Sequence, residues 1–233
     1  MSNVTRSNAM TNATPDEQSN ARSSRSKLLA EVRRQGIHDE RVLSAMERVP
    51  RDQFVESAQR QAAWANIALG IPHGQTISQP LVVALMSQAL ALTGDERVLE
   101  VGTGSGYQAA ILAELAREVV TIERIPALSA LAQSRFEALG IGNIVSIVGD
   151  GSAGWATGAP YDAIIVTAGA RELPAALLDQ LDTEHGRLVI PLGPADDERL
   201  TLIRMDHGIR SQHDLGSVRF VPLIRERYRE QQS

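Results

Sequence analysis

Three glycines separated by single small residues, Gly102, Gly104 and Gly106, follow directly on the strand-like run of residues 98–101. Glycines in such a turn let the backbone bend sharply between a strand and a helix, and they let a ligand approach where a Cβ would collide. A dinucleotide fingerprint needs its third glycine one residue later, at the position of Tyr107. The spacing therefore indicates a nucleotide-cofactor loop of another kind, and a bare turn is the less favoured alternative.

Acidic side chains recur where the following strands are expected to end. Glu123 comes about twenty residues after the glycines, where a carboxylate can accept hydrogen bonds from both hydroxyls of a ribose. Asp150, between Gly149 and Gly151, is either an acceptor for an adenine amino group or part of a plain turn. Glu100 lies within the first strand, where a carboxylate is costly unless it is hydrogen-bonded. We expect Glu100 either to brace the glycine loop or to approach the cofactor.

Two hydroxyls and two amides gather in residues 74–80, just before a long apolar run. The hydroxyls of Thr76 and Ser78, with free backbone N–H groups, can hold an anion at the start of a helix. The competing interpretation is that one hydroxyl only caps the helix that begins near Pro80. His73 is the only histidine near this segment, and we interpret it as a polar loop residue rather than a base. No Ser-His-Asp combination and no metal-ligand spacing is evident, so no metal is expected.

The composition excludes several classes of protein. The chain has 233 residues, a formal net charge of -5 and no cysteine. It lacks the basic footprint of a nucleic-acid binder, and disulfides, catalytic thiolates and cysteine-zinc sites are ruled out. No apolar run approaches the roughly 20 residues of a membrane span, and the N-terminus has no signal-peptide core. We expect a cytoplasmic monomer with no nucleic-acid partner and no membrane association.

Strand-like and helix-like segments alternate from residue 98 to residue 190, the rhythm of a parallel sheet covered on both faces. The expected strands cover residues 98–101, 119–122, 144–148, 163–166 and 187–190, and then 200–205 and 218–221 as an antiparallel pair. The predicted fold class is α/β: a Rossmann-like, doubly wound, mostly parallel seven-stranded sheet with an N-terminal helical extension. Ligands in such sheets bind beyond the carboxyl ends of the strands, where the candidate residues fall.

The glycine loop after an acidic strand residue resembles the first motif of S-adenosylmethionine (AdoMet)-dependent methyltransferases. Two longer runs, GQTISQP at residues 74–80 and RVLEVGTGSGYQAA at 97–110, closely resemble the protein-L-isoaspartate O-methyltransferase family. Further matches are RVPRDQFV at 48–55, GDG at 149–151, YDAIIVTA at 161–168 and VRFVPL at 218–223, so the resemblance spans about residues 27 to 225. The run at 74–80 is specific to this family, whereas the glycine motif is shared by many methyltransferases.

The resemblance implies a cofactor, a substrate and roles for individual residues. AdoMet is the implied cofactor, with Glu100, Gly102, Thr103, Gly104, Ser105, Gly106, Glu123, Asp150 and Gly151 as its binding residues. Ser78, with Thr76, is placed beside the acceptor carboxylate. The peptide groove is implied to include Gln79, Thr167, Ala168 and Val218, with the expected strand at residues 218–221 along its border. The implied reaction methylates the free carboxylate of L-isoaspartyl residues in damaged proteins and peptides. The ester then collapses through a succinimide that partly reopens to normal aspartate, which initiates repair.

The chemistry agrees with the lack of an evident base. A carboxylate with a pKa near 4 is already ionised at pH 7, so its attack on a sulfonium methyl needs positioning rather than proton removal. We therefore expect Ser78 to orient an anion. Three alternatives remain: a methyltransferase acting on another protein site or a small-molecule carboxylate, an AdoMet-binding protein without catalysis and, least favoured, an NAD-dependent oxidoreductase.

The expected organisation has four parts. These are a disordered tail at 1–25, an N-terminal helical segment with the substrate loop at 26–93, an AdoMet-binding core at 94–225 and a C-terminal tail at 226–233. Residues 70–73 and 169–171 depart from the family pattern, the latter where the family tends to have alanines and a proline. These departures are expected to alter peptide specificity or weaken peptide binding.

Overall fold

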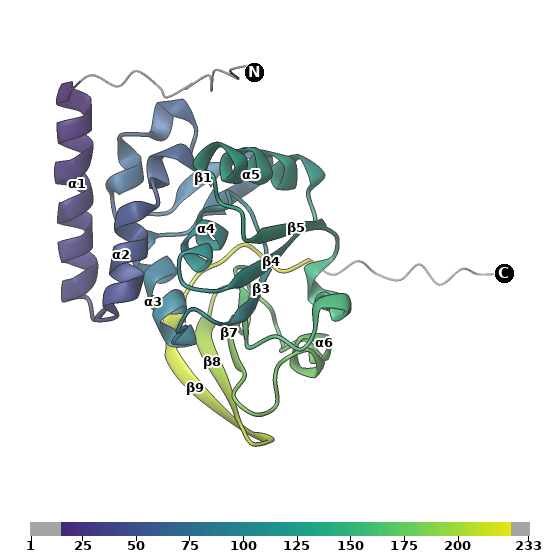
Figure 1. The fold of residues 1–233 in the computed structure, drawn as a ribbon. Coiled ribbons are helices and arrows are strands. Elements are labelled where there is room, and N and C mark those ends of the chain that lie inside the picture. The colour runs from purple at the N-terminus through teal and green to yellow at the C-terminus, as the bar shows by residue number, and fades with distance from the viewer. Residues whose placement is uncertain (1–14, 225–233) are drawn as a thin grey trace, which may run out of the picture.

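A seven-stranded sheet, in the order β5-β4-β3-β6-β7-β8-β9, runs through the centre of the computed structural model, which describes residues 15–224 (Figure 1). Its parallel strands are β3 (Arg97–Val101), β4 (Glu118–Glu123), β5 (Ile144–Val148), β6 (Ala163–Val166) and β7 (Arg187–Leu192). Two antiparallel strands, β8 (Glu198–Asp206) and β9 (Ile209–Val218), complete one side. The predicted mostly parallel sheet and its final antiparallel pair are confirmed.

The last strand does not lie where the sequence placed it. The chain turns tightly at His207 and Gly208, and β9 ends at Val218 instead of covering residues 218–221. β9 is an edge strand with mostly polar residues, and the apolar run that was expected to form this strand lies mostly beyond its end. Residues 219–224 form an extended segment, here named the strap, that leaves β9 and crosses the middle of the molecule (Figure 1).

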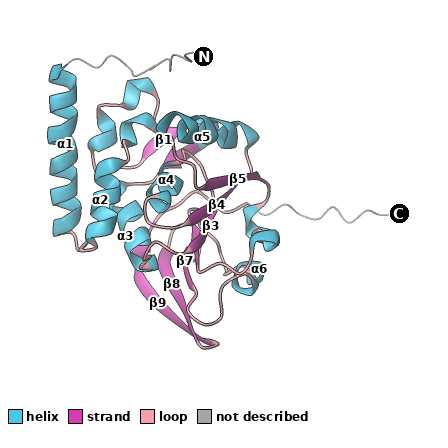
Figure 2. Cartoon of the chain, viewed as in Figure 1, coloured by secondary structure: helices cyan, strands magenta, loops and turns pink. Residues whose placement is uncertain are grey.

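Helices cover both faces of the sheet, as Figure 2 shows. The crossovers after β3 and β4 contain α4 (Tyr107–Ala113) and α5 (Pro126–Leu139), and the crossover after β6 contains α6 (Ala175–Asp179) on the other face. The chain thus leaves β3 in one direction and later returns to β6 on its other side. Such a reversal opens a crevice at the carboxyl ends of the two strands.

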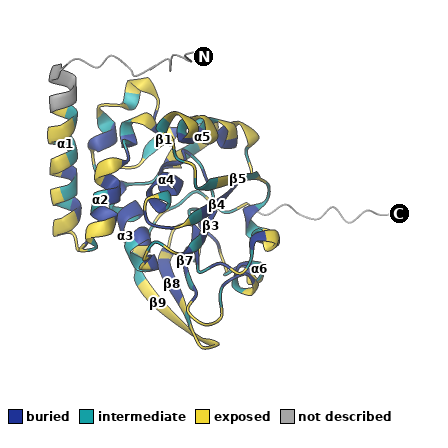
Figure 3. Cartoon of the chain, viewed as in Figure 1, coloured by how far each residue is buried: buried dark blue, intermediate teal, exposed yellow. Residues whose placement is uncertain are grey.

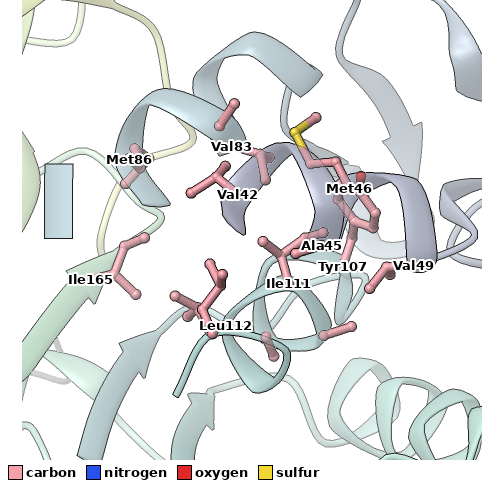
Figure 4. Close-up of a cluster of buried hydrophobic side chains, with 14 of the residues drawn as sticks. Val42, Ala45, Met46, Val49, Val83, Met86, Tyr107, Ile111, Leu112 and Ile165 are labelled. Carbon is pink, nitrogen blue, oxygen red and sulfur yellow. The ribbon is translucent and has the colours of Figure 1, made fainter. Parts of the chain in front are cut away.

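The N-terminal helices are α1 (Pro15–Arg34), α2 (Glu40–Arg48) and α3 (Pro80–Leu90), and they pack on the face that carries α4 (Figure 1). Asp39 caps α2, and its side chain accepts hydrogen bonds from the N–H groups of Arg41 and Val42. Side chains of α2, α3, α4 and β6 meet in one buried cluster, including Met46, Met86 and Ile165 (Figure 4). The helical extension therefore shares its core with the sheet.

The prediction of a disordered tail at residues 1–25 is wrong for residues 15–25, because α1 begins at Pro15 and includes them. Arg25 holds this part of the helix: its Nη1 donates to the Glu47 carbonyl at 2.7 Å, and its guanidinium lies 4.5 Å from the centre of the Trp64 ring. The sequence argument counted only apolar side chains and missed this contact. The expectations for residues 1–14 and 226–233 lie outside the described residues.

Figure 3 shows buried residues in the central strands and in α4, whereas the outer face of α1 and the edge strand β9 are largely exposed. All four residues of β6 are buried, as suits a central parallel strand. A short hairpin, β1 (Leu69–Ile71) and β2 (Gln75–Ile77), precedes α3 and carries the hydroxyl-rich segment. Among residues 15–224, no helix combines the length and the apolar character needed to cross a bilayer.

Candidate active site

A cavity of about 860 Å³, counting the solvent at its mouth, lies at the carboxyl ends of β3, β4 and β6. Ten of the sequence-predicted residues line it: Thr76, Ser78, Gly102, Thr103, Gly104, Ser105, Glu123, Gly151, Thr167 and Ala168. The fold therefore brings together residues from the hairpin, the glycine loop and the ends of three strands.

The three glycines of the loop serve different contacts. A Cβ on Gly102 would lie 2.5 Å from Oγ1 of Thr167, and a Cβ on Gly106 would lie 2.9 Å from Cε1 of Phe136. Gly104 has a φ of 51°, and a Cβ there would meet nothing closer than 3.8 Å. Gly102 and Gly106 thus allow β6 and α5 to pack closely, whereas Gly104 leaves open space at the cavity. Gly106 does not line the cavity.

Glu123 is held rigidly at the end of β4. Its Oε2 accepts the N–H of Gly104 and its Oε1 accepts the N–H of Ile125, each at 2.9 Å. The side chain is 5% exposed, at the wall of the cavity. Each carboxylate oxygen can accept a further hydrogen bond, so the pair suits a ligand with two adjacent hydroxyls.

Glu100 is fully buried and lies outside the cavity lining. Thr121 donates to its Oε2, and the Thr121 hydroxyl also lies 2.6 Å from that of Thr103 in the glycine loop. Burial raises the pKa of Glu100 to about 8, and the nearby charge of Glu123 adds to this effect. This geometry fits the first of the two roles expected for Glu100, in which its carboxyl group braces the glycine loop.

Asp150 accepts the N–H of Ser152 at 2.9 Å and so caps the single turn Gly151–Ala153. It does not line the cavity, whereas Gly151 does, and a Cβ on Gly151 would lie 2.5 Å from Cγ1 of Val101. The turn interpretation therefore describes Asp150, and the close approach explains the glycine that follows it.

The hydroxyls of residues 74–80 do not cap the helix that follows them, α3. Gln79 is the residue at the cap of α3 and makes no side-chain cap bond, while the N–H of Leu81 donates to Oδ1 of Asn66 at 3.0 Å. Within residues 15–224, the Ser78 hydroxyl has no hydrogen-bond partner, and it lines the cavity together with Thr76. The interpretation of Ser78 or Thr76 as a helix cap is wrong.

Two further predicted residues and His73 lie away from the cavity. His73 is exposed at the hairpin turn, with a φ of 61°, and the departure at residues 70–73 is part of this hairpin. Gln79 and Val218 do not line the cavity, and Val218 instead packs against the main core. The strap supplies the wall that was assigned to Val218, through Val221 and the residues that follow it.

Several lining residues were missed, namely Gln75, Tyr107, Gln108, Arg124, Ile125, Pro222, Leu223 and Ile224. Arg124 and Ile125 could have been found, because they directly follow the predicted Glu123. The strap includes Val221, within the run 218–221 that the resemblance implied, and continues through Pro222, Leu223 and Ile224, for which no role was expected. It is bound to the end of β6, where the Gly169 N–H donates to the Val221 carbonyl at 2.8 Å and the Leu223 N–H donates to the Gly169 carbonyl at 2.7 Å.

A buried arginine supports the loop from behind. Arg51 donates through Nε to the Ala63 carbonyl at 2.9 Å, and its guanidinium lies 5.0 Å from the centre of the Tyr107 ring. Burial lowers the pKa of Arg51 to about 10 and raises the pKa of Tyr107 to about 12. Arg51 thus connects the first residue of α4 with the segment that leads into the hairpin.

The reversal of strand order at β3, the glycine loop that follows it and the ribose-type acid at the end of β4 define a Rossmann-like, AdoMet-dependent methyltransferase. The family model described as protein-L-isoaspartate(D-aspartate) O-methyltransferase matches residues 23–228. The chain belongs to this family.

Relatives with the same family name are similar in sequence over most of the chain. It is 51% identical over 189 residues to a protein-L-isoaspartate O-methyltransferase of Syntrophobacter fumaroxidans, covering 81% of this chain and 88% of the relative. It is 52% identical over 195 residues to one of Xanthobacter autotrophicus, covering 83% and 88%. A beta-aspartate methyltransferase (PCMT) structure from Plasmodium falciparum, in complex with S-adenosyl-L-homocysteine, has a TM-score of 0.74 at 27% identity and covers 85% of this chain and 97% of that one. The predicted family, enzyme class and AdoMet cofactor are confirmed.

Proposed function

We propose that this cavity transfers the methyl group of AdoMet to the free carboxylate of L-isoaspartyl residues in proteins and peptides. Methylation of isoaspartyl residues is the activity of the family to which the chain belongs. The observation that carries the assignment of the site is the placement of the unpartnered Ser78 hydroxyl in the same cavity as Glu123 and the glycine loop. One set of residues can hold a methyl donor and another set an anionic acceptor.

The residues present fit AdoMet. The oriented carboxylate of Glu123 can accept from the ribose hydroxyls, and the open space at Gly104 admits the ligand close to the backbone. Apolar side chains of Val101, Ile122 and Ile125 line the same cavity and can contact the adenine. When bound, the cofactor supplies an electrophilic methyl group on a sulfonium sulfur.

On the acceptor side, Ser78 and Thr76 present hydroxyls to a carboxylate. A hydroxyl that donates to one carboxylate oxygen leaves the other free to form the new bond to carbon. The acceptor loses no proton because it is already ionised, so alignment of the two reactants is the main contribution of the protein. Thr167 and Ala168, at the end of β6, line the cavity and are proposed to border the peptide.

The finer assignments extend the same proposal. We infer a monomer acting in the cytoplasm on proteins and peptides and not on nucleic acid, supported by the net charge of -5 and the lack of a basic cluster in the sequence. The methyl ester carries a better leaving group than the ionised carboxylate does. The backbone nitrogen of the following residue can therefore attack the ester carbonyl carbon, release methanol with the amide proton and close a succinimide. Hydrolysis of that ring partly yields normal aspartate, which is the repair.

Methyl transfer from labelled AdoMet tests the function directly. An isoaspartyl peptide is compared with the matched aspartyl peptide and with a peptide that carries a β-amino acid without the free carboxylate. We expect label in the isoaspartyl peptide alone, released as methanol as the ester closes to the succinimide. Equal labelling of the aspartyl peptide, or AdoMet binding without transfer, would instead support another acceptor or a binding protein.

A further inference from the structure

The strap is held by a buried carboxylate that the reaction itself does not use. Glu198, the first residue of β8, is 3% exposed, and its Oε2 accepts the N–H of Phe220 at 2.7 Å. Glu198 is paired with Val218, the last residue of β9, in the antiparallel ladder. Its side chain therefore supplies an acceptor just past the point where β9 ends.

Gly169 holds the same segment from the other side and touches the same carboxylate. It makes two backbone hydrogen bonds that flank Pro222, one with Val221 and one with Leu223. A Cβ on Gly169 would lie 1.8 Å from Oε1 of Glu198, far inside contact distance. The carboxylate thus occupies the space that any side chain at residue 169 would need, which gives a physical reason for a glycine at this departure from the family pattern.

The strap meets the acceptor half of the cavity. In the sheet order, β6 lies next to β3 on the side away from β4, which carries Glu123. The strap is bound to the end of β6 and to the start of β8, and it lines the cavity along with Thr167 and Ala168. A shift of the strap would therefore change the wall on the side away from the ribose-type acid.

We propose that Glu198 is a positioning residue for isoaspartyl methylation, which holds the strap against Gly169 and so keeps the acceptor wall in place. This inference rests on the proposed function, because it assigns a wall of the same cavity to the acceptor peptide. Glu198 acts only through the strap and touches neither reactant.

Four variants separate this role from general stabilisation. Glu198→Ala removes the acceptor of the Phe220 N–H, whereas Glu198→Gln keeps an oxygen that can accept it. Gly169→Ala drives a methyl group into the carboxylate, and the double variant Gly169→Ala/Glu198→Ala removes that clash. Glu96→Ala is the matched control, because Glu96 is also buried and accepts backbone N–H groups, from Thr93 and Gly94, but it precedes β3 at the opposite end of the sheet.

We expect Glu198→Ala and Gly169→Ala to raise the KM for an isoaspartyl peptide about tenfold or more. Each change weakens the hydrogen bond to the Glu198 carboxylate that holds the strap, and the loss of such a bond to a charged group shifts an equilibrium by about this factor. The Kd of AdoMet, measured by calorimetry, should change by less than about twofold. Glu198→Gln should retain most of the affinity for the peptide. The double variant should be no worse than Glu198→Ala, because the two residues share one contact.

Hydrogen exchange of residues 219–224, followed by mass spectrometry, provides a readout that does not depend on activity. Exchange in the strap should rise in Glu198→Ala and remain at the wild-type rate in Glu96→Ala. Wild-type KM and wild-type exchange in a folded Glu198→Ala would overturn the inference, as would an equal rise in KM in Glu96→Ala. If the wild type does not methylate the isoaspartyl peptide, the proposed function fails, and the exchange result alone decides whether Glu198 holds the strap.

Discussion

The two halves of the cavity are built in different ways. The cofactor half uses segments that are close in sequence: the glycine loop and Glu123 follow neighbouring strands, and hydrogen bonds between them already orient the carboxylate. The acceptor half joins the hairpin, the end of β6 and the strap, which are far apart in the chain. Its hydroxyl at Ser78 has no partner among residues 15–224. The cofactor half is thus preorganised, whereas the acceptor half leaves the Ser78 hydroxyl available to a ligand.

The largest expected effect comes from closing the open space of the cofactor half. Gly104→Val places a branched side chain at a φ of 51° beside the cavity, and we expect AdoMet affinity to fall by about two orders of magnitude or more. Gly140→Val is a control for backbone strain, because Gly140 has a φ of 70° at the end of α5 and does not line the cavity. Calorimetry that shows equal AdoMet affinity for both variants would contradict the placement of the cofactor.

The brace at Glu100 should appear in the pH dependence of stability. Burial raises its pKa from an ordinary value of 4.5 to about 8, so between these two pH values the folded state keeps a proton that the unfolded state loses. Unfolding free energy should therefore fall as pH rises through this window, by up to about 1.4 kcal/mol per pH unit.

Glu100→Gln removes this titration while keeping the shape of the side chain. Urea unfolding of the variant between about pH 5 and pH 8 should show a flatter pH dependence than the wild type. An unchanged slope would mean that Glu100 is ionised in the folded protein.

A substitution of Glu123 tests whether this preorganised carboxylate binds AdoMet. Loss of a hydrogen bond to a charged group costs about 1.5–3 kcal/mol, so Glu123→Ala should weaken AdoMet binding about tenfold or more. Glu118→Ala, at the other end of β4 and half-buried, is the matched control. Wild-type AdoMet affinity in a folded Glu123→Ala would exclude the ribose role.

The smallest expected effect is a loss of stability, and it distinguishes the Ser78 hydroxyl of the acceptor half from the residue that caps α3. Asn66→Ala removes the acceptor of the Leu81 N–H and should cost about 0.5–2 kcal/mol of stability. Ser78→Ala removes no hydrogen bond with any of residues 15–224 and should leave the melting temperature almost unchanged. Thermal unfolding of the two variants side by side decides, and a loss in Ser78→Ala as large as that in Asn66→Ala would restore a capping role.

The difference between the halves also explains what the sequence could predict. The sheet, the glycine loop and Glu123 follow from local patterns of strand, turn and acid, and the run at residues 74–80 could be recognised as a motif. The run at residues 218–223 could be recognised as a family match, but the way the strap is held could not be predicted, because its contacts with Gly169 and Glu198 are created only by the folded chain. The cap of α3 was missed for the same reason, since Asn66 lies well before the helix.

The position of the first helix shows a further limit of pattern reading. Residues 15–25 have few apolar side chains, and burial arguments alone predicted disorder. A cation over an aromatic ring and a long-range bond from Arg25 hold this turn of α1 in place. Polar side chains with distant partners are invisible to hydrophobic periodicity.

The central claim is that donor and acceptor are held by separable halves of one cavity, and Ser78→Ala tests it most directly. AdoMet affinity by calorimetry and kcat/KM for an isoaspartyl peptide are measured on the same folded variant, beside the wild type. The account predicts wild-type AdoMet affinity with a fall of about tenfold or more in kcat/KM, since misplacement at the reacting centre is costly. A variant with unchanged kcat/KM, or with AdoMet affinity lowered as much as activity, would contradict it.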